Sequence, residues 1–258
     1  MKKTFATIVL LALGGVFALA QARAVPPGMV HVEGGTIWMG GRYVTLSSFN
    51  IGRFPVTQGE WYDLMGTRPS HFAGADWRNL PVEQVSWFDA IEFANAKSRR
   101  AGLAPAYTIS GTGANRAVTW NRDANGYRLP TEAEWEFAAR GGAVCRGNFE
   151  FSGSNVVGEV AWHSGNSGGS TQLVGMLRPN ALGIYDMSGN VWEWVWDWHG
   201  ALPSSGQATN PTGAAAGGDR VFRGGGWVDA PGYARSAFRI GDIPGVRSGA
   251  IGFRVVRP

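Results

Sequence analysis

The sequence predicts one α+β domain built from three helices, short strands and many loops. Helix starts with capping side chains stand at Thr57, Ser86 and Thr131. Short runs rich in β-branched and aromatic residues, separated by glycines, indicate strands. The chain has 39 glycines and 12 tryptophans among its 258 residues. This composition is typical of tight turns anchored by large aromatic side chains rather than of long regular elements.

The predicted strands and helices follow one another along the first 140 residues or so. Residues 29–32 and 36–41 are expected as strands, and residues 49–56 as a further extended segment. Each capped helix start has an acidic residue three positions further on, which completes the capping pattern. The predicted helices run from Thr57 through Met65 and from Ser86 to about Arg100, and a third begins at Thr131 and contains Trp135, Ala138 and Ala139.

After residue 141 the pattern changes to loops and short strands. Residues 165–170 and 201–218 are rich in glycine, serine, alanine and proline, so we expect surface connections there. No internal repeat, charge block or linker-like composition divides the chain. We therefore assign residues 25–258 to one domain.

The first 24 residues have the features of a secretory signal peptide. Lys2 and Lys3 form a basic start, residues 5–19 are apolar, and residues 22–24 read ARA, a small-x-small cleavage pattern. The apolar segment is too short to span a bilayer, and no later segment is both apolar and long enough. We expect an exported protein, periplasmic, cell-surface or secreted, that does not span a membrane.

The charge pattern argues against nucleic acid and anionic lipid as partners. The formal net charge is +4, but without Lys2, Lys3 and Arg23 of the leader the chain carries 20 basic and 19 acidic side chains. Cys145 is the only cysteine, so the exported chain has no internal disulfide. We expect Cys145 as a buried, small apolar residue.

Four motifs occur in an order that resembles the formylglycine-generating, or sulfatase-modifying-factor, family. They are FPVT at 54–57, PVEQVSW at 81–87, YRLPTEAEWE at 127–136 and GIYDMSGNVWEW at 183–194, and GFR at 252–254 follows them. Each motif is weak alone, and the ordered set covers nearly the whole chain beyond the leader. The resemblance implies a C-type-lectin-like fold of the formylglycine-generating-enzyme type.

The oxidases of this family use two cysteines that this chain lacks. The resemblance places them at Asp229 and Ala234, with a serine at Gly226. The oxidase chemistry depends on copper held by two thiolates, and Cys145 alone does not supply a pair. We therefore expect no catalytic residue, no required cofactor, and a function in binding. An enzyme of the family that uses other residues and a cell-envelope accessory protein are the alternatives.

The C-terminal segment also resembles the variable proteins of diversity-generating retroelements, which share the C-type-lectin-like fold. In those proteins the segment is rewritten at template adenines, and the resulting codons cannot encode Lys, Glu, Gln, Trp or Met. These five types account for 36 of the 258 residues, yet none occurs at residues 228–251, hereafter the C-terminal stretch. The alternative is an ordinary glycine-rich loop.

The resemblance implies that the C-terminal stretch binds the ligand, an unknown protein or surface molecule. Tyr233 and Phe238 are expected as aromatic anchors, and Asp229 and Asp242 as polar contacts. The expected constant frame is Trp227, Arg235, Ser236, Ala237, Arg239, Pro244 and Arg247. The predicted ligand-binding residues are Val228, Asp229, Gly232, Tyr233, Phe238, Ile240, Gly241, Asp242, Ile243, Gly245, Val246, Ser248, Gly249 and Ala250.

A calcium site is a second implication of the resemblance. Asp186, Gly189, Val191 and Glu193 match positions at which family members hold calcium, an ion that accepts several oxygen ligands. The alternative is a turn in which Asp186 and Asn190 bond local backbone amides.

Tryptophans occupy every second position from residue 192 to residue 198, so on a strand they share one face. Core packing beneath the C-terminal stretch is the favoured interpretation, and a stacking platform for a ligand is the alternative. We expect Asp197 and Arg223 to tie this strand to the glycine-rich segment that begins at residue 223.

Overall fold

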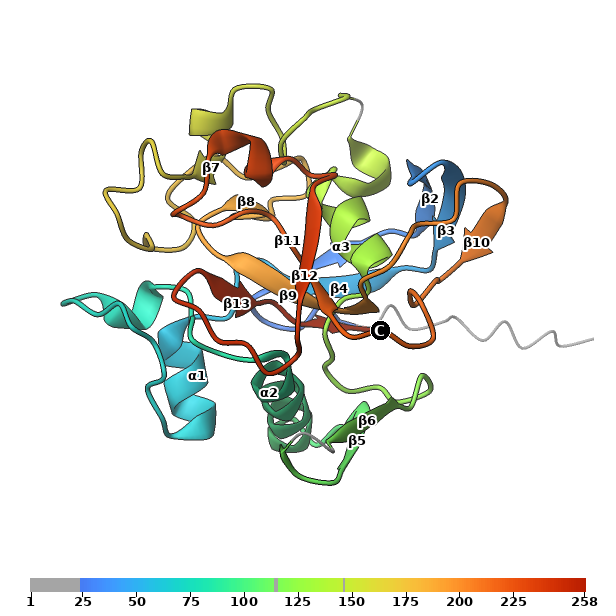
Figure 1. Cartoon of the computed structure of the whole chain (residues 1–258), viewed down its shortest axis with the longest axis horizontal. Helices are drawn as coiled ribbons and strands as arrows, with labels where there is room; N and C mark the ends of the chain where they lie inside the picture. The colour runs from blue at the N-terminus through green and yellow to red at the C-terminus, as the bar shows by residue number, and fades with distance from the viewer. Residues whose placement is uncertain (1–23, 114–115, 146) are drawn as a thin grey trace, which may run out of the picture.

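The computed structural model describes residues 24–113, 116–145 and 147–258 (Figure 1). The predicted signal peptide, except for Ala24, lies outside the described residues. In the part of the chain that the structure describes, no helix is long and apolar enough to cross a bilayer.

A four-stranded sheet in the order β12-β11-β9-β13 forms the centre of the molecule (Figure 1). β9 (Trp192–Trp198) is antiparallel to β11 (Arg220–Arg223) and parallel to β13 (Ile251–Phe253). β12 (Arg239–Asp242) pairs antiparallel with β11. The C-terminal stretch therefore contains one edge strand of this sheet and begins the other.

Smaller sheets surround the central one. β1 (Met29–Val32), β4 (Phe49–Gly52) and β14 (Val256–Arg257) form an antiparallel sheet that joins the two ends of the described chain. A second three-stranded sheet has the order β10-β3-β2. The remaining strands are β2 (Gly35–Met39), β3 (Arg42–Leu46), β5 (Tyr107–Ser110), β6 (Ala117–Trp120), β7 (Ala161–Trp162), β8 (Ser188–Gly189) and β10 (Gln207–Thr209).

Three α-helices stand in the described residues: α1 (Gln58–Met65), α2 (Trp87–Arg100) and α3 (Glu132–Ala139). The predicted starts are confirmed, because Thr57, Ser86 and Thr131 each accept a backbone N–H of the first turn. Short 3-10 turns cover Trp77–Asn79, Gly142–Val144, Val157–Glu159 and Pro231–Ala234. The predicted α+β class is thus confirmed.

The structure contains strands that the sequence did not predict, and one predicted strand is shorter than expected. The predicted strand 36–41 ends at Met39, because Gly40 and Gly41 adopt positive φ and turn the chain into β3. The hairpin of β5 and β6 was not expected, and β10 lies inside the segment predicted as a surface connection. β10 is three residues long and pairs in parallel with the distant β3, so no local pattern marks it.

Both faces of β9 are buried, in different apolar clusters. Trp192 and Trp194 pack with residues of α1, α2 and β13, whereas Val195 packs with Trp135 of α3. The alternation expected for tryptophans on one strand face is confirmed, and core packing accounts for Trp192 and Trp194.

A buried ion pair joins β9 to the chain's end. Glu193 is fully buried and accepts hydrogen bonds of 2.6 Å from both Nε and Nη2 of Arg254, and one of 2.7 Å from Trp135 Nε1. Arg254 also donates to the carbonyl oxygens of Gly52 and Tyr185, at 3.0 Å each. One guanidinium therefore connects β9, β4 and the segment before β8.

Replacing Arg254 by methionine should remove the partner of a fully buried carboxylate. We expect Arg254→Met to lower the free energy of unfolding by about 3–5 kcal/mol, measured by urea titration. The control is Arg78→Met, which breaks a half-exposed pair with Asp63 and should cost less than about 1 kcal/mol. Equal losses in the two variants would contradict the central role of Arg254.

Candidate functional site

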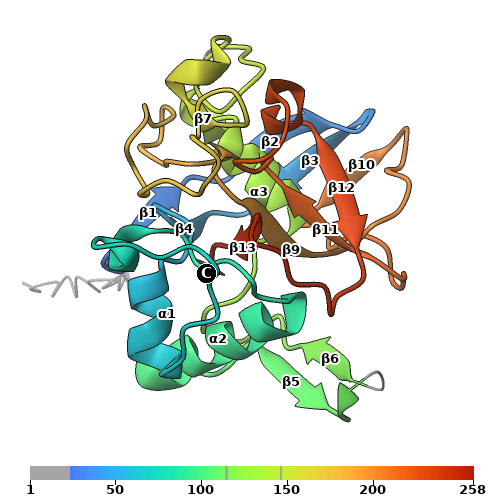
Figure 2. The ribbon, with the colours of Figure 1, turned by 60° about the vertical axis from the view of Figure 1, so that its left-hand side comes forward.

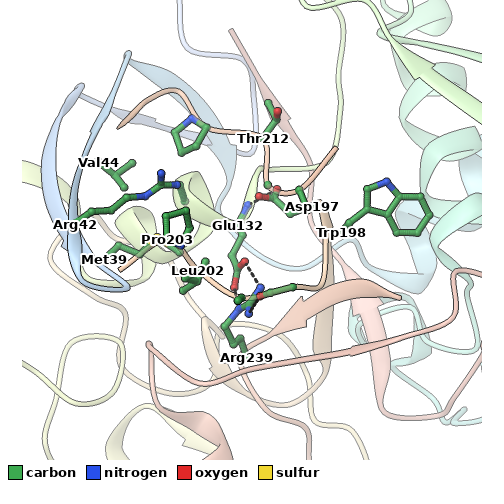
Figure 3. A pocket seen from close by; sticks show the side chains of 16 residues that line it. Met39, Arg42, Val44, Glu132, Asp197, Trp198, Leu202, Pro203, Thr212 and Arg239 are labelled. Atoms are coloured by element: carbon green, nitrogen blue, oxygen red, sulfur yellow. Dashed lines mark hydrogen bonds and ion pairs between the residues drawn. The ribbon is translucent and has the colours of Figure 1, made fainter. Parts of the chain in front are cut away.

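Ion pairs from α3 hold the central sheet beneath the C-terminal stretch. Arg223 of β11 donates to Glu132 at 2.5 Å and to Glu136 at 2.6 Å. Arg239 of β12 donates to both oxygens of Glu132, at 2.7 and 2.9 Å (Figure 3). Burial alone would raise the pKa of Glu132, but Arg223 and Arg239 outweigh it and hold that pKa below its usual range.

Asp197 and Arg223 were expected to tie β9 to the glycine-rich segment, but each of them bonds α3 instead. Asp197 accepts the backbone N–H of Glu132 at 2.8 Å, and Arg223 binds the carboxylates of the same helix. Asp197 lies in β9 and Arg223 in β11. Both reach α3 because this helix packs against both strands. Beside them lies a cavity of about 300 Å³, whose wall includes Asp197, Arg239 and Arg42 (Figure 3).

The C-terminal stretch presents several apolar side chains to solvent. Val228, Tyr233, Ile240 and Ile243 are large, exposed side chains, and Gly245 is exposed as well. Ala250 is buried in the main core cluster, which also contains Trp192 and Val82. The half-buried members of the predicted binding set are Asp229, Gly232, Phe238, Gly241, Asp242, Val246, Ser248 and Gly249.

Several of the residues expected as a constant frame bond the rest of the molecule or are buried in it. Trp227 donates its indole N–H to the carbonyl oxygen of Gly249 at 2.9 Å. Ser236 is fully buried, and Arg247 donates to Asp89 at 2.8 Å. Arg239 binds Glu132, so bonded or buried frame residues stand between the exposed apolar residues of the stretch. Arg235, Ala237 and Arg247 of the frame are exposed.

Asp229 is tied into the scaffold rather than presented to solvent. One of its carboxylate oxygens accepts the indole N–H of Trp192 at 2.7 Å and the backbone N–H of Gly226 at 3.0 Å. Tyr233 and Phe238 contact each other edge-on with ring centroids 4.8 Å apart, and both lie against Trp192. The predicted aromatic anchors thus share one buried tryptophan as support.

Two more predicted binding residues have structural constraints of their own. A side chain at Gly241 would place its Cβ 2.7 Å from Cβ of His199 and 3.0 Å from the carbonyl oxygen of Arg220, so this position fits glycine. Asp242 accepts the backbone N–H of Ile243 at 2.7 Å and so stabilises its own turn.

The residues predicted for calcium are engaged in other contacts. Both oxygens of Glu193 bind Arg254, and Asp186 accepts the backbone N–H of Gly175 at 2.7 Å. Burial raises the pKa of Asp186 to about 6, against the lowering effects of the Gly175 hydrogen bond and of Arg254. Among the described residues no group of three or more His, Cys, Asp or Glu side chains is placed to hold a metal ion. Because its carboxylate already pairs with an arginine, Glu193 does not fit the calcium site in this arrangement.

The positions of the oxidase cysteines carry no thiol chemistry here. Asp229 bonds Trp192, and Ala234 is buried at the end of the 3-10 turn Pro231–Ala234. Cys145 is half-buried rather than fully buried, and its thiol donates to the carbonyl oxygen of Gly147 at 3.4 Å. It follows the 3-10 turn Gly142–Val144, which comes after α3.

A family model described as the sulfatase-modifying factor enzyme 1-like domain matches residues 16–258. The chain belongs to this family. Chaperone protein LppX of Paenibacillus barcinonensis is 38% identical over 92% of each chain. The formylglycine-generating enzyme of Mus musculus is 31% identical over 75% of this chain, which spans only 50% of that protein.

Among solved structures, Treponema denticola variable protein 1 is similar to this sulfatase-modifying-factor chain. It has a TM-score of 0.82 and 33% identity, and the match covers 89% of this chain and 95% of that one. The predicted family and the predicted C-type-lectin-like fold of the formylglycine-generating type are therefore confirmed.

The buried carboxyl of Asp197 should make stability depend on pH. Burial, reinforced by the nearby Glu132 carboxylate, raises the pKa of Asp197 to about 8. An unfolded aspartate titrates near pH 4, so between about pH 4 and pH 8 the folded state binds more protons than the unfolded state. Stability contributed by this group is therefore present at low pH and is lost as pH rises through that window.

Asp197→Asn keeps an oxygen that accepts the Glu132 amide but removes the titration. We expect the stability of the variant relative to wild type to rise between pH 5 and pH 8, by up to about 1.4 kcal/mol per pH unit, in urea unfolding. Asp123→Asn, at an exposed loop position, is the control. A difference that stays constant with pH would show that Asp197 is ionised throughout.

Proposed function

We propose that this chain is an exported, non-catalytic member of the family that binds a protein or surface ligand through its C-terminal stretch. The sequence supports the non-catalytic part, because Asp229 and Ala234 replace the two cysteines of the oxidases. The similarity to Treponema denticola variable protein 1, with a TM-score of 0.82, favours a displayed and diversified surface.

The alternation along the C-terminal stretch carries the proposal. Val228, Tyr233 and Ile243 expose large apolar side chains, whereas Ser236 and Arg239 are held by the scaffold. Exposed aromatic and aliphatic groups supply contact area for a partner. Because the bonded residues hold the backbone, the exposed side chains can change without loss of the fold.

The scaffold beneath the stretch suits rigid display. Both edge strands of the central sheet belong to or adjoin the stretch, and Trp192 supports the Tyr233–Phe238 pair from below. A binding surface held in one conformation before the ligand arrives loses less conformational entropy on binding. Recognition in this proposal is reversible and requires no bound cofactor.

A cell-envelope accessory protein is the second candidate. Its support is the 38% identity to Chaperone protein LppX over 92% of each chain. An accessory protein would use a fixed surface for a fixed partner, so its C-terminal stretch would be invariant.

The first test is deep sequencing of the 3′ end of the gene and its flanking DNA, in a population grown from one cell. We expect substitutions confined to positions such as Val228, Tyr233, Phe238 and Ile240, beside an adenine-rich copy of the segment. An invariant stretch without such a copy would exclude diversification and favour the accessory protein.

The proposal also predicts unequal tolerance within the stretch. Val228→Ser should change the free energy of unfolding by less than about 0.5 kcal/mol, because the side chain is exposed. Arg239→Met should cost about 1.5–3 kcal/mol, because it removes charge-assisted hydrogen bonds to the buried Glu132, which keeps Arg223 as a partner. Urea unfolding of both variants measures the difference. Similar losses of unfolding free energy would contradict the division of the stretch into scaffold-bonded residues and exposed binding residues.

A further inference from the structure

A second cavity, of about 810 Å³, is lined by residues from the start of α2, the start of β6, the end of β9 and the start of β11. Figure 2 shows the ribbon of these elements. Its size is in the range of small-molecule binding sites. Aromatic and basic side chains dominate its wall. They are Trp87, Phe88, Trp196, Trp198, Arg116, Arg220 and Arg247.

Arg220 on this wall is a buried cation without a carboxylate partner. Four arginines of the described residues are buried, and three of them pair with a carboxylate: Arg128 with Glu134, Arg223 with Glu132 and Glu136, and Arg254 with Glu193. Arg220, only 4% exposed, donates from Nη1 to the carbonyl oxygen of Trp196, and its Nε has no hydrogen-bond partner within the described chain.

The surrounding charges do not neutralise Arg220. Burial lowers the pKa of Arg220 to about 9, the direction expected of a cation that lacks a counter-ion, and the group stays charged at neutral pH. The neighbouring Asp197 has its pKa raised to about 8, mainly by burial, so it is mostly uncharged there. The other two arginines of the wall are already paired, Arg116 with Glu92 and Arg247 with Asp89.

Tryptophans hold the Arg220 guanidinium in one orientation. Its central carbon lies 3.4 Å from the ring centroid of Trp198, 3.9 Å from that of Trp87 and 4.9 Å from that of Trp196. A planar guanidinium held in this way is preorganised to donate two parallel hydrogen bonds to a carboxylate. A single uncompensated charge favours a monoanion over a phosphate, which carries nearly two charges.

We propose that this cavity binds an aromatic carboxylate. The carboxylate accepts hydrogen bonds from Arg220, and the ring packs against the apolar wall of Phe88, Val118 and Ile243. A free aromatic acid and a peptide that ends in an aromatic residue share this chemistry. Arg220 and its tryptophans lie outside the C-terminal stretch, so recognition of the carboxylate group does not depend on the proposed diversification. The apolar wall does share Ile243 with that stretch.

The first experiment uses the wild-type protein and isothermal titration calorimetry. The probes are 3-phenylpropionate and its neutral amide, and an acetylated tripeptide that ends in phenylalanine, with a free or an amidated C-terminus. We expect at least one acid to bind about tenfold more tightly than its amide, because the amide lacks the charge that Arg220 requires. Binding of 3-phenylpropionate would identify the ligand as a free aromatic acid, and binding of the tripeptide would identify it as a peptide C-terminus. Equal binding of each acid and its amide, or no binding of any probe, would overturn the proposal.

Variants then test the assigned residue. Arg220→Met should abolish the preference for the acid over the amide, with the fold checked by circular dichroism. The matched control is Arg68→Met, which removes a guanidinium stacked 4.0 Å from the Trp77 ring, away from the cavity. An undiminished preference in a folded Arg220→Met protein would refute the site. If that variant does not fold, the acid–amide comparison on the wild-type protein decides alone.

Discussion

Buried pairs between arginines and carboxylates are the interaction on which the rest of this structure depends. Glu132 and Glu136 of α3 bind Arg223, and Glu193 of β9 binds Arg254. A charge removed from water is costly unless a partner and further hydrogen bonds compensate it. These groups are compensated only when α3, β9, β11 and the chain's end occupy their native places. The pairs therefore specify how the small sheets and short helices fit together.

Because of the same network, the stability of the C-terminal stretch depends on its bonded residues and little on its exposed side chains. Arg239 bonds Glu132, Trp227 bonds the backbone at Gly249, and Ser236 is buried. These contacts fix the backbone at intervals, and the exposed residues between them contribute little to the core. A scaffold with this division can present different side chains at the same positions.

The two faces of β9 differ in whether the buried charge beside them is paired with an opposite charge. On the odd-numbered face, the carboxylate of Glu193 is matched by Arg254. On the even-numbered face, tryptophans surround Arg220, and no carboxylate of the described residues pairs with it. Trp192 and Trp194 are core residues, whereas Trp196 and Trp198 also line the cavity. The alternating tryptophans therefore serve packing at one end of the strand and form a cavity wall at the other.

The sequence by itself determined the features that depend on neighbouring residues. Caps at Thr57, Ser86 and Thr131 start the helices, and period-two tryptophans mark β9. Ordered motifs were enough for the family and its fold.

Only the tertiary structure decided which distant groups meet. Arg223 and Glu132 are 91 residues apart, and the contact of Asp229 with Trp192 spans 37 residues. β10 needs the distant β3, and Gly241 is constrained by His199. Local propensity acts over one or two turns of chain, whereas burial, ion pairing and strand partnership depend on the whole packed molecule. The missing counter-ion of Arg220 belongs to this second kind, because an unpaired charge is defined by everything around it.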